Sequence, residues 1–273
     1  MFPVYAQQIT QQRWVTDPII VEEVDKIVLT GSMICFLLLA LAFIMGLYVV
    51  KSVGKGAINV TFISFTFGIF FTGLSRLFMY LTDINIYSLE EVTHHIWWHL
   101  LFYFSLLSFI WGGLRLKEIS VKMEGVRLRD GLVWGSMVFL GVIIFVVAQP
   151  LEIVLGPALK GTIIETWGLY HFVAFALAAV AATYLFYIKT NWGKILNVSV
   201  TPILIFLLLM SLQHLWELLT ESWKILSLES YIIERVELVI VLCALVFLNI
   251  AVVRIIQFIH LQAAPAKTGL LQT

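Results

Sequence analysis

Most of the histidines in this chain lie inside long apolar segments, which makes them its first candidates for chemistry. His95 and His99 are four residues apart and share one face if their segment is helical. His171 and His214 lie in two later apolar segments. Neutral imidazole is the commonest metal ligand in proteins. These four histidines are therefore candidate metal ligands.

Acidic residues recur at helical spacing in the last two apolar segments. Glu217 and Glu221 follow His214 by three and seven residues, which places all three on one helix face. Glu234 and Glu237 form another pair, three residues apart. Imidazole nitrogen and carboxylate oxygen together suit Zn²⁺, Fe, Mn and Cu(II). Pairs with this spacing on facing helices build metal sites in helical bundles, so the pattern predicts a His/Glu metal site.

The composition indicates that membrane-spanning helices carry these residues. Of 273 residues, 61% are hydrophobic and 12% are charged, and the mean hydropathy is +0.98. Soluble domains are about 45–50% apolar and about 25% charged. These values exclude a soluble enzyme, a disordered chain and a disulfide scaffold, and they make the lipid bilayer the expected surroundings. Because the net charge is zero, no global field attracts nucleic acid.

Seven apolar segments reach the length of about 20 residues that a helix needs to cross the hydrocarbon core. They cover approximately residues 27–50, 57–82, 93–117, 131–154, 163–189, 197–222 and 231–259. Backbone polar groups must be satisfied within lipid, which predicts helices. We expect an all-α integral membrane protein built as a seven-transmembrane-helix bundle. Its expected parts are an extracytoplasmic N-terminal segment (1–26), one transmembrane domain (27–260) and a cytoplasmic tail (261–273).

Basic residues are distributed unevenly between the two sides of the predicted bundle. The segments at one side hold eleven basic and three acidic residues, a net charge of +8. The opposite side, together with the outer helix halves, holds six basic and fourteen acidic residues, a net charge of −8. The positive-inside rule then places the N-terminus outside and the C-terminus in the cytoplasm.

The candidate residues also lie at a common depth. His99, His171, His214 and Glu237 each lie about six to eight residues inside the expected outer end of their helix, or roughly 10 Å at 1.5 Å per residue. Arg76, in the second segment, lies at nearly the same level. Ionisable residues inside a span are functional candidates by default. We therefore expect one site, in the outer half of the bundle and open to the extracytoplasmic side.

Together these patterns favour a metalloprotein of the cell (plasma) membrane, acting as a metal-dependent oxidoreductase or hydrolase. The expected ligands are His95, His99, His171, His214, Glu217, Glu234 and Glu237. So many ligands could hold two ions, or one ion with a filled outer shell. The metal would be Fe, Zn or Cu. Glu221 or Glu217 could act as general base, and Arg76 could hold a carboxylate or an anionic substrate group.

Three alternatives fit the same residues. Haem b could be ligated by His99 together with His171 or His214, which would make the protein an electron carrier. The carboxylates could form a structural ion-pair network with Arg76 and Arg235. The chain could also be non-catalytic: a transporter, a receptor, or a subunit that packs against other membrane subunits.

In size and topology the chain resembles two groups of seven-helix proteins. Microbial rhodopsins carry a lysine in the last helix for retinal, but residues 238–250 contain no lysine, which argues against a retinal pigment. The zinc hydrolases of the adiponectin-receptor and alkaline-ceramidase type have a paired His-x3-His late in the bundle. Here that pair, His95 and His99, lies in the third segment. The resemblance therefore assigns no residue roles and no family.

Overall fold

The computed structural model describes residues 18–53, 57–83, 89, 91–118, 127–191 and 193–263. They form α2 (Pro18–Ser52), α3 (Ala57–Asp83), α4 (Glu91–Glu118), α5 (Arg127–Leu159), α6 (Ile163–Thr166), α7 (Leu169–Asn191), α8 (Gly193–Glu217) and α9 (Ser230–Ala263), with a π-helical turn, η1 (Leu218–Ser222), directly after α8. Within these ranges there is no strand. Seven of the helices are long and apolar enough to cross a membrane, which confirms the predicted all-helical, seven-helix class.

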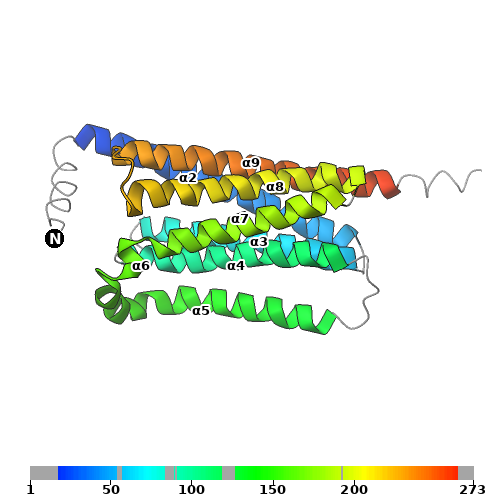
Figure 1. The fold of residues 1–273 in the computed structure, drawn as a ribbon, viewed down its shortest axis with the longest axis horizontal. Helices are drawn as coiled ribbons and strands as arrows, with labels where there is room; N and C mark the ends of the chain where they lie inside the picture. The colour runs from blue at the N-terminus through cyan, green and yellow to red at the C-terminus, as the bar shows by residue number, and fades with distance from the viewer. Residues whose placement is uncertain are drawn as a thin grey trace, which may run out of the picture.

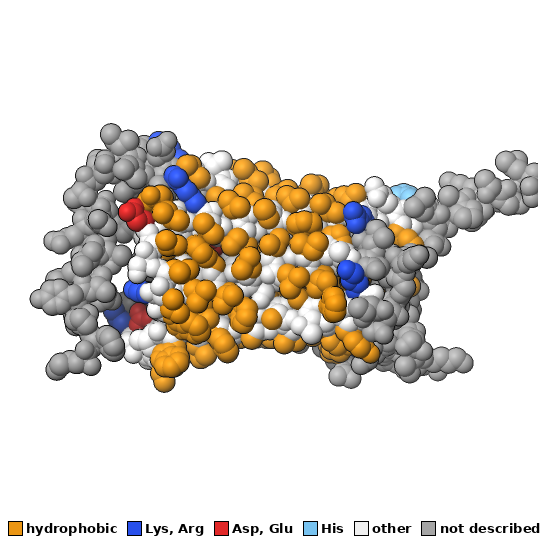
Figure 2. Space-filling model, turned by 45° about the horizontal axis from the view of Figure 1, so that its top comes forward, with side chains coloured by type: hydrophobic (Ala, Val, Ile, Leu, Met, Phe, Trp, Pro, Cys, Tyr) orange, Lys and Arg blue, Asp and Glu red, His pale blue; other side chains and the backbone are white. Residues whose placement is uncertain are grey.

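The surface of the bundle matches that class. On the face shown in Figure 2, apolar side chains cover the middle of the molecule, and the charged side chains lie toward its two ends. Helix α2 starts at one end of the bundle and α9 finishes at the other (Figure 1), as an odd number of crossings requires. The direction of insertion stays a prediction. Residues 1–17 and 264–273, which belong to the predicted N-terminal segment and tail, lie outside the described residues.

Six of the long helices form a closed ring. Each helix packs against the next in the order α2, α3, α4, α7, α8 and α9, and α9 packs back against α2. Helix α5 lies outside the ring, mainly against α4 (Figure 1). Its buried face carries Ile144 and Ala148, whereas Val146 and Ile153 are exposed. A ring of this kind encloses the side chains that its helices direct inward.

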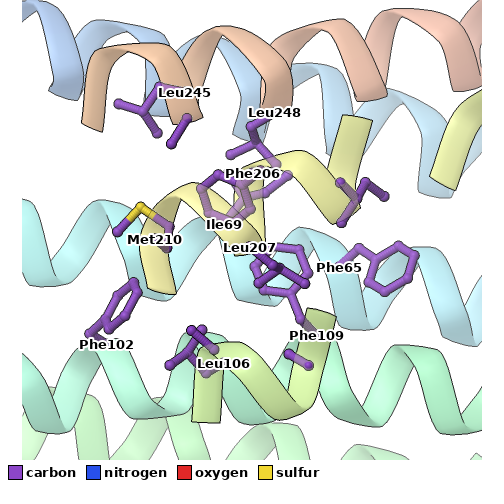
Figure 3. Close-up of a cluster of buried hydrophobic side chains, with 14 of the residues drawn as sticks. Phe65, Ile69, Phe102, Leu106, Phe109, Phe206, Leu207, Met210, Leu245 and Leu248 are labelled. Atoms are coloured by element: carbon purple, nitrogen blue, oxygen red, sulfur yellow. The ribbon is translucent and has the colours of Figure 1, made fainter. Parts of the chain in front are cut away.

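A layer of packed apolar side chains fills the middle of this ring (Figure 3). Phe102 from α4, Phe206 and Met210 from α8, and Leu245 from α9 are all buried in it. Phe102 comes three residues after His99 along α4, about one helical turn. The apolar layer therefore directly adjoins the level of the candidate site.

The direction of each helix explains why the candidate residues meet. Helices α4, α7 and α9 begin, and α3 and α8 finish, at the end of the bundle where α2 begins (Figure 1). Residues early in α4, α7 and α9 therefore share a level with residues late in α3 and α8. This end is the one that the charge distribution predicts to face outward.

A candidate metal centre

Four side chains from three neighbouring helices come together at this end. His99 lies on α4, His171 on α7, and His214 and Glu217 on α8. One ligand atom from each lies within 4.8 Å of the others. All four residues are buried, at most 2% exposed. The described residues thus include a His₃Glu group that could hold a metal ion, and its four members are among the seven predicted ligands.

One hydrogen bond shows which nitrogen of His99 carries the proton. His99 Nδ1 lies 2.6 Å from the backbone oxygen of His95. A carbonyl oxygen only accepts, so Nδ1 donates and Nε2 keeps its lone pair. His214 Nδ1 lies 2.7 Å from Glu217 Oε2, close enough for these two atoms to bind the same ion. The Nε2 atoms of His99 and His214 take part in neither of these contacts.

Those nitrogens have no hydrogen-bond partner in the described part of the chain. The same holds for both ring nitrogens of His171. His171 Nδ1 lies 2.8 Å from Glu217 Oε2, but the contact lacks hydrogen-bond alignment. A buried polar atom without a partner costs about 1–3 kcal/mol. Three buried imidazoles left unsatisfied at one place therefore need an explanation.

A close approach between two segments places His171 beside α8 and η1. Gly168 adopts a left-handed backbone conformation (φ +57°), and a Cβ atom there would lie only 1.9 Å from Ser222 Oγ. Glycine therefore satisfies both the backbone and the packing requirement. His171 follows three residues later. Its Nε2 lies 3.6 Å from Oε2 of Glu221, which is carried by η1. Single π-helical turns of this kind are frequent at functional sites.

A second polar group adjoins the four residues on the side of α3 and α9. Gln213 Nε2 donates to Glu217 Oε1 and to Glu237 Oε1, both at 2.8 Å. Arg76 donates to Gln213 Oε1 at 3.0 Å and lies 3.5 Å from Glu237 Oε1. Arg76 also lies over the Trp98 ring, 5.5 Å from its centroid. The Arg76 guanidinium thus contacts Gln213, Glu237 and Trp98. Gln213 links Glu237 to the His₃Glu group.

The remaining predicted ligands lie around the four-residue group and are not part of it. The His95 ring contacts the His171 ring at 5.3 Å, and His95 Nδ1 accepts a hydrogen bond from Trp98 Nε1 at 3.4 Å. Glu234 is half-buried on α9, one turn before Glu237. Their predicted role as ligands, and that of Glu237, stays a prediction, as do the catalytic roles of Glu221 and Arg76.

Two features were missed by the sequence analysis. Gln213 is not ionisable and so does not stand out among the charged residues of the spans, although it precedes Glu217 by four residues and so lies on its face. The structural ion-pair alternative also did not say which carboxylate pairs with which basic residue. Arg76 pairs with Glu237, whereas Glu217 contacts His171 and His214.

No family model, curated protein or solved structure matches this chain. The function is therefore argued from the site itself.

Proposed function

We propose that this chain is a membrane metalloprotein that binds one transition-metal ion through His99, His171, His214 and Glu217. One observation carries the proposal: the three imidazoles converge with buried ring nitrogens that have no partner among the described residues. A bound ion supplies the missing partner for each lone pair. Nothing in the group requires two ions, so we favour a single ion surrounded by hydrogen-bonded residues.

The donor atoms narrow the choice of metal. Three imidazole nitrogens and one carboxylate oxygen suit Zn²⁺, Fe²⁺ or Cu²⁺, whereas Ca²⁺ and Mg²⁺ prefer sites built from oxygen atoms.

The packing of the histidines favours a bare ion over haem. The ring centroid of His99 lies 4.7 Å from the ring centroid of His171 and 5.2 Å from that of His214. Trp98 and Phe102 pack on the same group, with the Phe102 ring 4.9 Å from the His214 ring. Imidazoles in mutual ring contact suit a small ion between them, whereas a porphyrin has to lie flat between its two ligands.

Glu221 supports a hydrolytic role for the site. Its side chain is 34% exposed, while its Oε2 lies 3.6 Å from the buried His171 Nε2. It can therefore exchange protons with the medium and still reach the edge of the centre. A bound metal ion would supply a water of lowered pKa, and Glu221 would serve as the general base. We favour a metal-dependent hydrolase over an oxidoreductase, with the centre facing the extracytoplasmic side of the plasma membrane.

Cobalt titration of the protein in detergent micelles tests this proposal. Co²⁺ accepts the same donor atoms and has visible absorption bands that report its ligands. We expect one Co²⁺ per chain, displaced by Zn²⁺ and lost in the His99→Ala, His171→Ala and His214→Ala variants. Glu221→Gln should bind Co²⁺ with an affinity within tenfold of the unaltered protein, because Glu221 is not a ligand. Absence of Co²⁺ binding to the folded protein, or equal binding by the three histidine variants, would contradict the proposal.

A further inference from the structure

Gln213 hydrogen-bonds both to Glu217 of the four-residue group and to the Arg76–Glu237 pair. It uses both polar ends of its amide. The Nε2 group donates to Glu217 Oε1 and to Glu237 Oε1, at 2.8 Å each, and Oε1 accepts from Arg76. The residue is fully buried. An amide nitrogen has two hydrogens, so these two bonds use both of them.

These bonds determine which oxygen of Glu217 faces the imidazoles. Oε1 is held by Gln213, and Oε2 lies 2.7 Å from His214 Nδ1 and 2.8 Å from His171 Nδ1. A carboxylate can otherwise rotate about its last bond and present either oxygen, or both, to an ion. With Oε1 held by Gln213, only Oε2 is directed toward the imidazoles.

The amide of Gln213 is itself held in one orientation. Rotation of the amide by half a turn would bring its carbonyl oxygen against the two carboxylates and its NH₂ group against the Arg76 guanidinium. Both contacts would be repulsive, because a carboxylate only accepts and a guanidinium only donates. Arg76 and Glu237, from α3 and α9, thereby fix the direction of the bond that Gln213 makes to Glu217.

We infer that Gln213 is a positioning residue of the metal centre, which holds the Glu217 carboxylate so that Oε2 alone is offered to the ion. This inference rests on the function proposed above. Groups that orient metal ligands typically change metal affinity by about 10- to 100-fold when they are removed. Gln213 acts on the ion through Glu217 and is not itself a ligand.

The test compares Gln213→Met with a matched control, Asn249→Leu, by titration with Co²⁺. Methionine keeps the approximate size of glutamine and removes all three bonds. Asn249 is another amide within a spanning helix, bonded to the backbone oxygens of Leu38 and Leu245. It lies twelve residues beyond Glu237 on α9, or about 18 Å along the helix. Asn249→Leu therefore reports the general effect of losing an amide from the bundle.

We expect Gln213→Met to bind Co²⁺ about 10- to 100-fold more weakly and with altered visible bands, because a freed Glu217 can present both oxygens. Asn249→Leu should change neither quantity. If Gln213→Met does not fold, Gln213→Asn keeps the amide but is shorter by one methylene, and we expect the same two changes.

Three other outcomes of this titration would each contradict a specific claim. Unchanged affinity and unchanged bands in the Gln213 variants, with normal binding by the unaltered protein, would overturn the role of Gln213 alone. Equal losses in the Gln213 variants and Asn249→Leu would do the same, since the effect would then be general destabilisation. Absence of Co²⁺ binding in the unaltered protein would overturn the proposed function and this inference together.

Discussion

At the scale of single residues, the proposed site combines imidazoles that have partnerless ring nitrogens with neighbours that are hydrogen-bonded to one another. His99 Nε2, His214 Nε2 and both ring nitrogens of His171 are buried without hydrogen-bond partners among the described residues. Gln213 and Arg76, in contrast, have their polar atoms directed at one another and at carboxylates. This contrast agrees with the proposed metal centre, because a bound ion would supply the partners that the imidazoles lack.

Replacement of His214 by alanine tests the ligand role directly. Loss of one of four ligands should weaken Zn²⁺ binding by at least about tenfold, the lower end of what even outer-shell changes produce. His260→Ala is the control, because His260 is exposed at the far end of α9 and contacts Tyr48. Competition titration with a coloured zinc chelator measures both affinities. Equal affinities for His214→Ala and the unaltered protein would exclude His214 as a ligand.

A pair of Glu-to-Gln variants separates the metal centre from a purely structural ion pair. Glu217→Gln should lower metal affinity strongly, because a neutral amide is a poor ligand. Glu237→Gln should mainly lower the free energy of unfolding, by about 2 kcal/mol, because Arg76 loses its charged hydrogen-bond partner. Metal titration and thermal unfolding of both variants give the two quantities. Equal effects on metal affinity would show that the centre does not distinguish the two carboxylates.

At the scale of elements, the junction between α7 and η1 positions His171 against α8. Glycine at 168 meets two demands there, a positive φ angle and the approach of Ser222. Gly161 also has a positive φ angle, +72°, but a Cβ atom at that position meets nothing within 4 Å. Substitutions at these two glycines therefore distinguish the effect of backbone strain from the effect of a clash between segments.

Gly168→Ala should lower both stability and metal affinity, whereas Gly161→Ala should lower stability alone. Each variant carries the left-handed strain of about 1–2 kcal/mol, but only Gly168→Ala forces α7 away from η1 and moves His171. Adding Ser222→Gly to Gly168→Ala should restore part of the metal affinity, because the clashing side chain is removed. Thermal unfolding and Zn²⁺ titration measure both effects. A similar loss of metal affinity in Gly161→Ala would contradict this account of the junction.

The sequence was sufficient to predict the number of spans and the common level of the histidines, because hydropathy fixes length and helical rise fixes depth. It was not sufficient to select the four grouped residues from the seven candidate ligands. His95 and His99 share a face by spacing and both contact His171, yet only His99 joins the group, because the turn of α4 that carries His99 also approaches His214 on α8. The π-helical turn that carries Glu221 has no signature in spacing alone.

At the scale of the whole molecule, the closed ring explains why the centre lies among its inward-facing side chains. The ring consists of six helices, and it also encloses the apolar layer of Phe102, Phe206 and Met210 (Figure 3). Phe102 follows His99 by three residues on α4, so this layer adjoins the centre. A packed apolar layer next to a charged one does not suit an ion path across the membrane. Helix α5, which lies outside the ring, makes no part of the four-residue group.

Because the proposed ligands come from three helices of the ring, a bound ion should stabilise the entire bundle. At a free Zn²⁺ concentration of 100 times Kd, the free energy of unfolding should rise by about 2.7 kcal/mol. Thermal unfolding in detergent micelles, with and without Zn²⁺, gives this difference, and a chelator should reverse it. A comparable rise in His214→Ala would show that Zn²⁺ stabilises the protein elsewhere.

The metal content of the purified protein tests the central claim most directly. The chain should be purified in detergent without chelators, and its transition metals should be measured by elemental analysis together with protein concentration. The account predicts one ion of Zn, Fe or Cu per chain, and less than a tenth of that amount when His99, His171 and His214 are all replaced by alanine. Folded protein that contains no transition metal, and that takes up none when Zn²⁺, Fe²⁺ or Cu²⁺ is supplied, would contradict it.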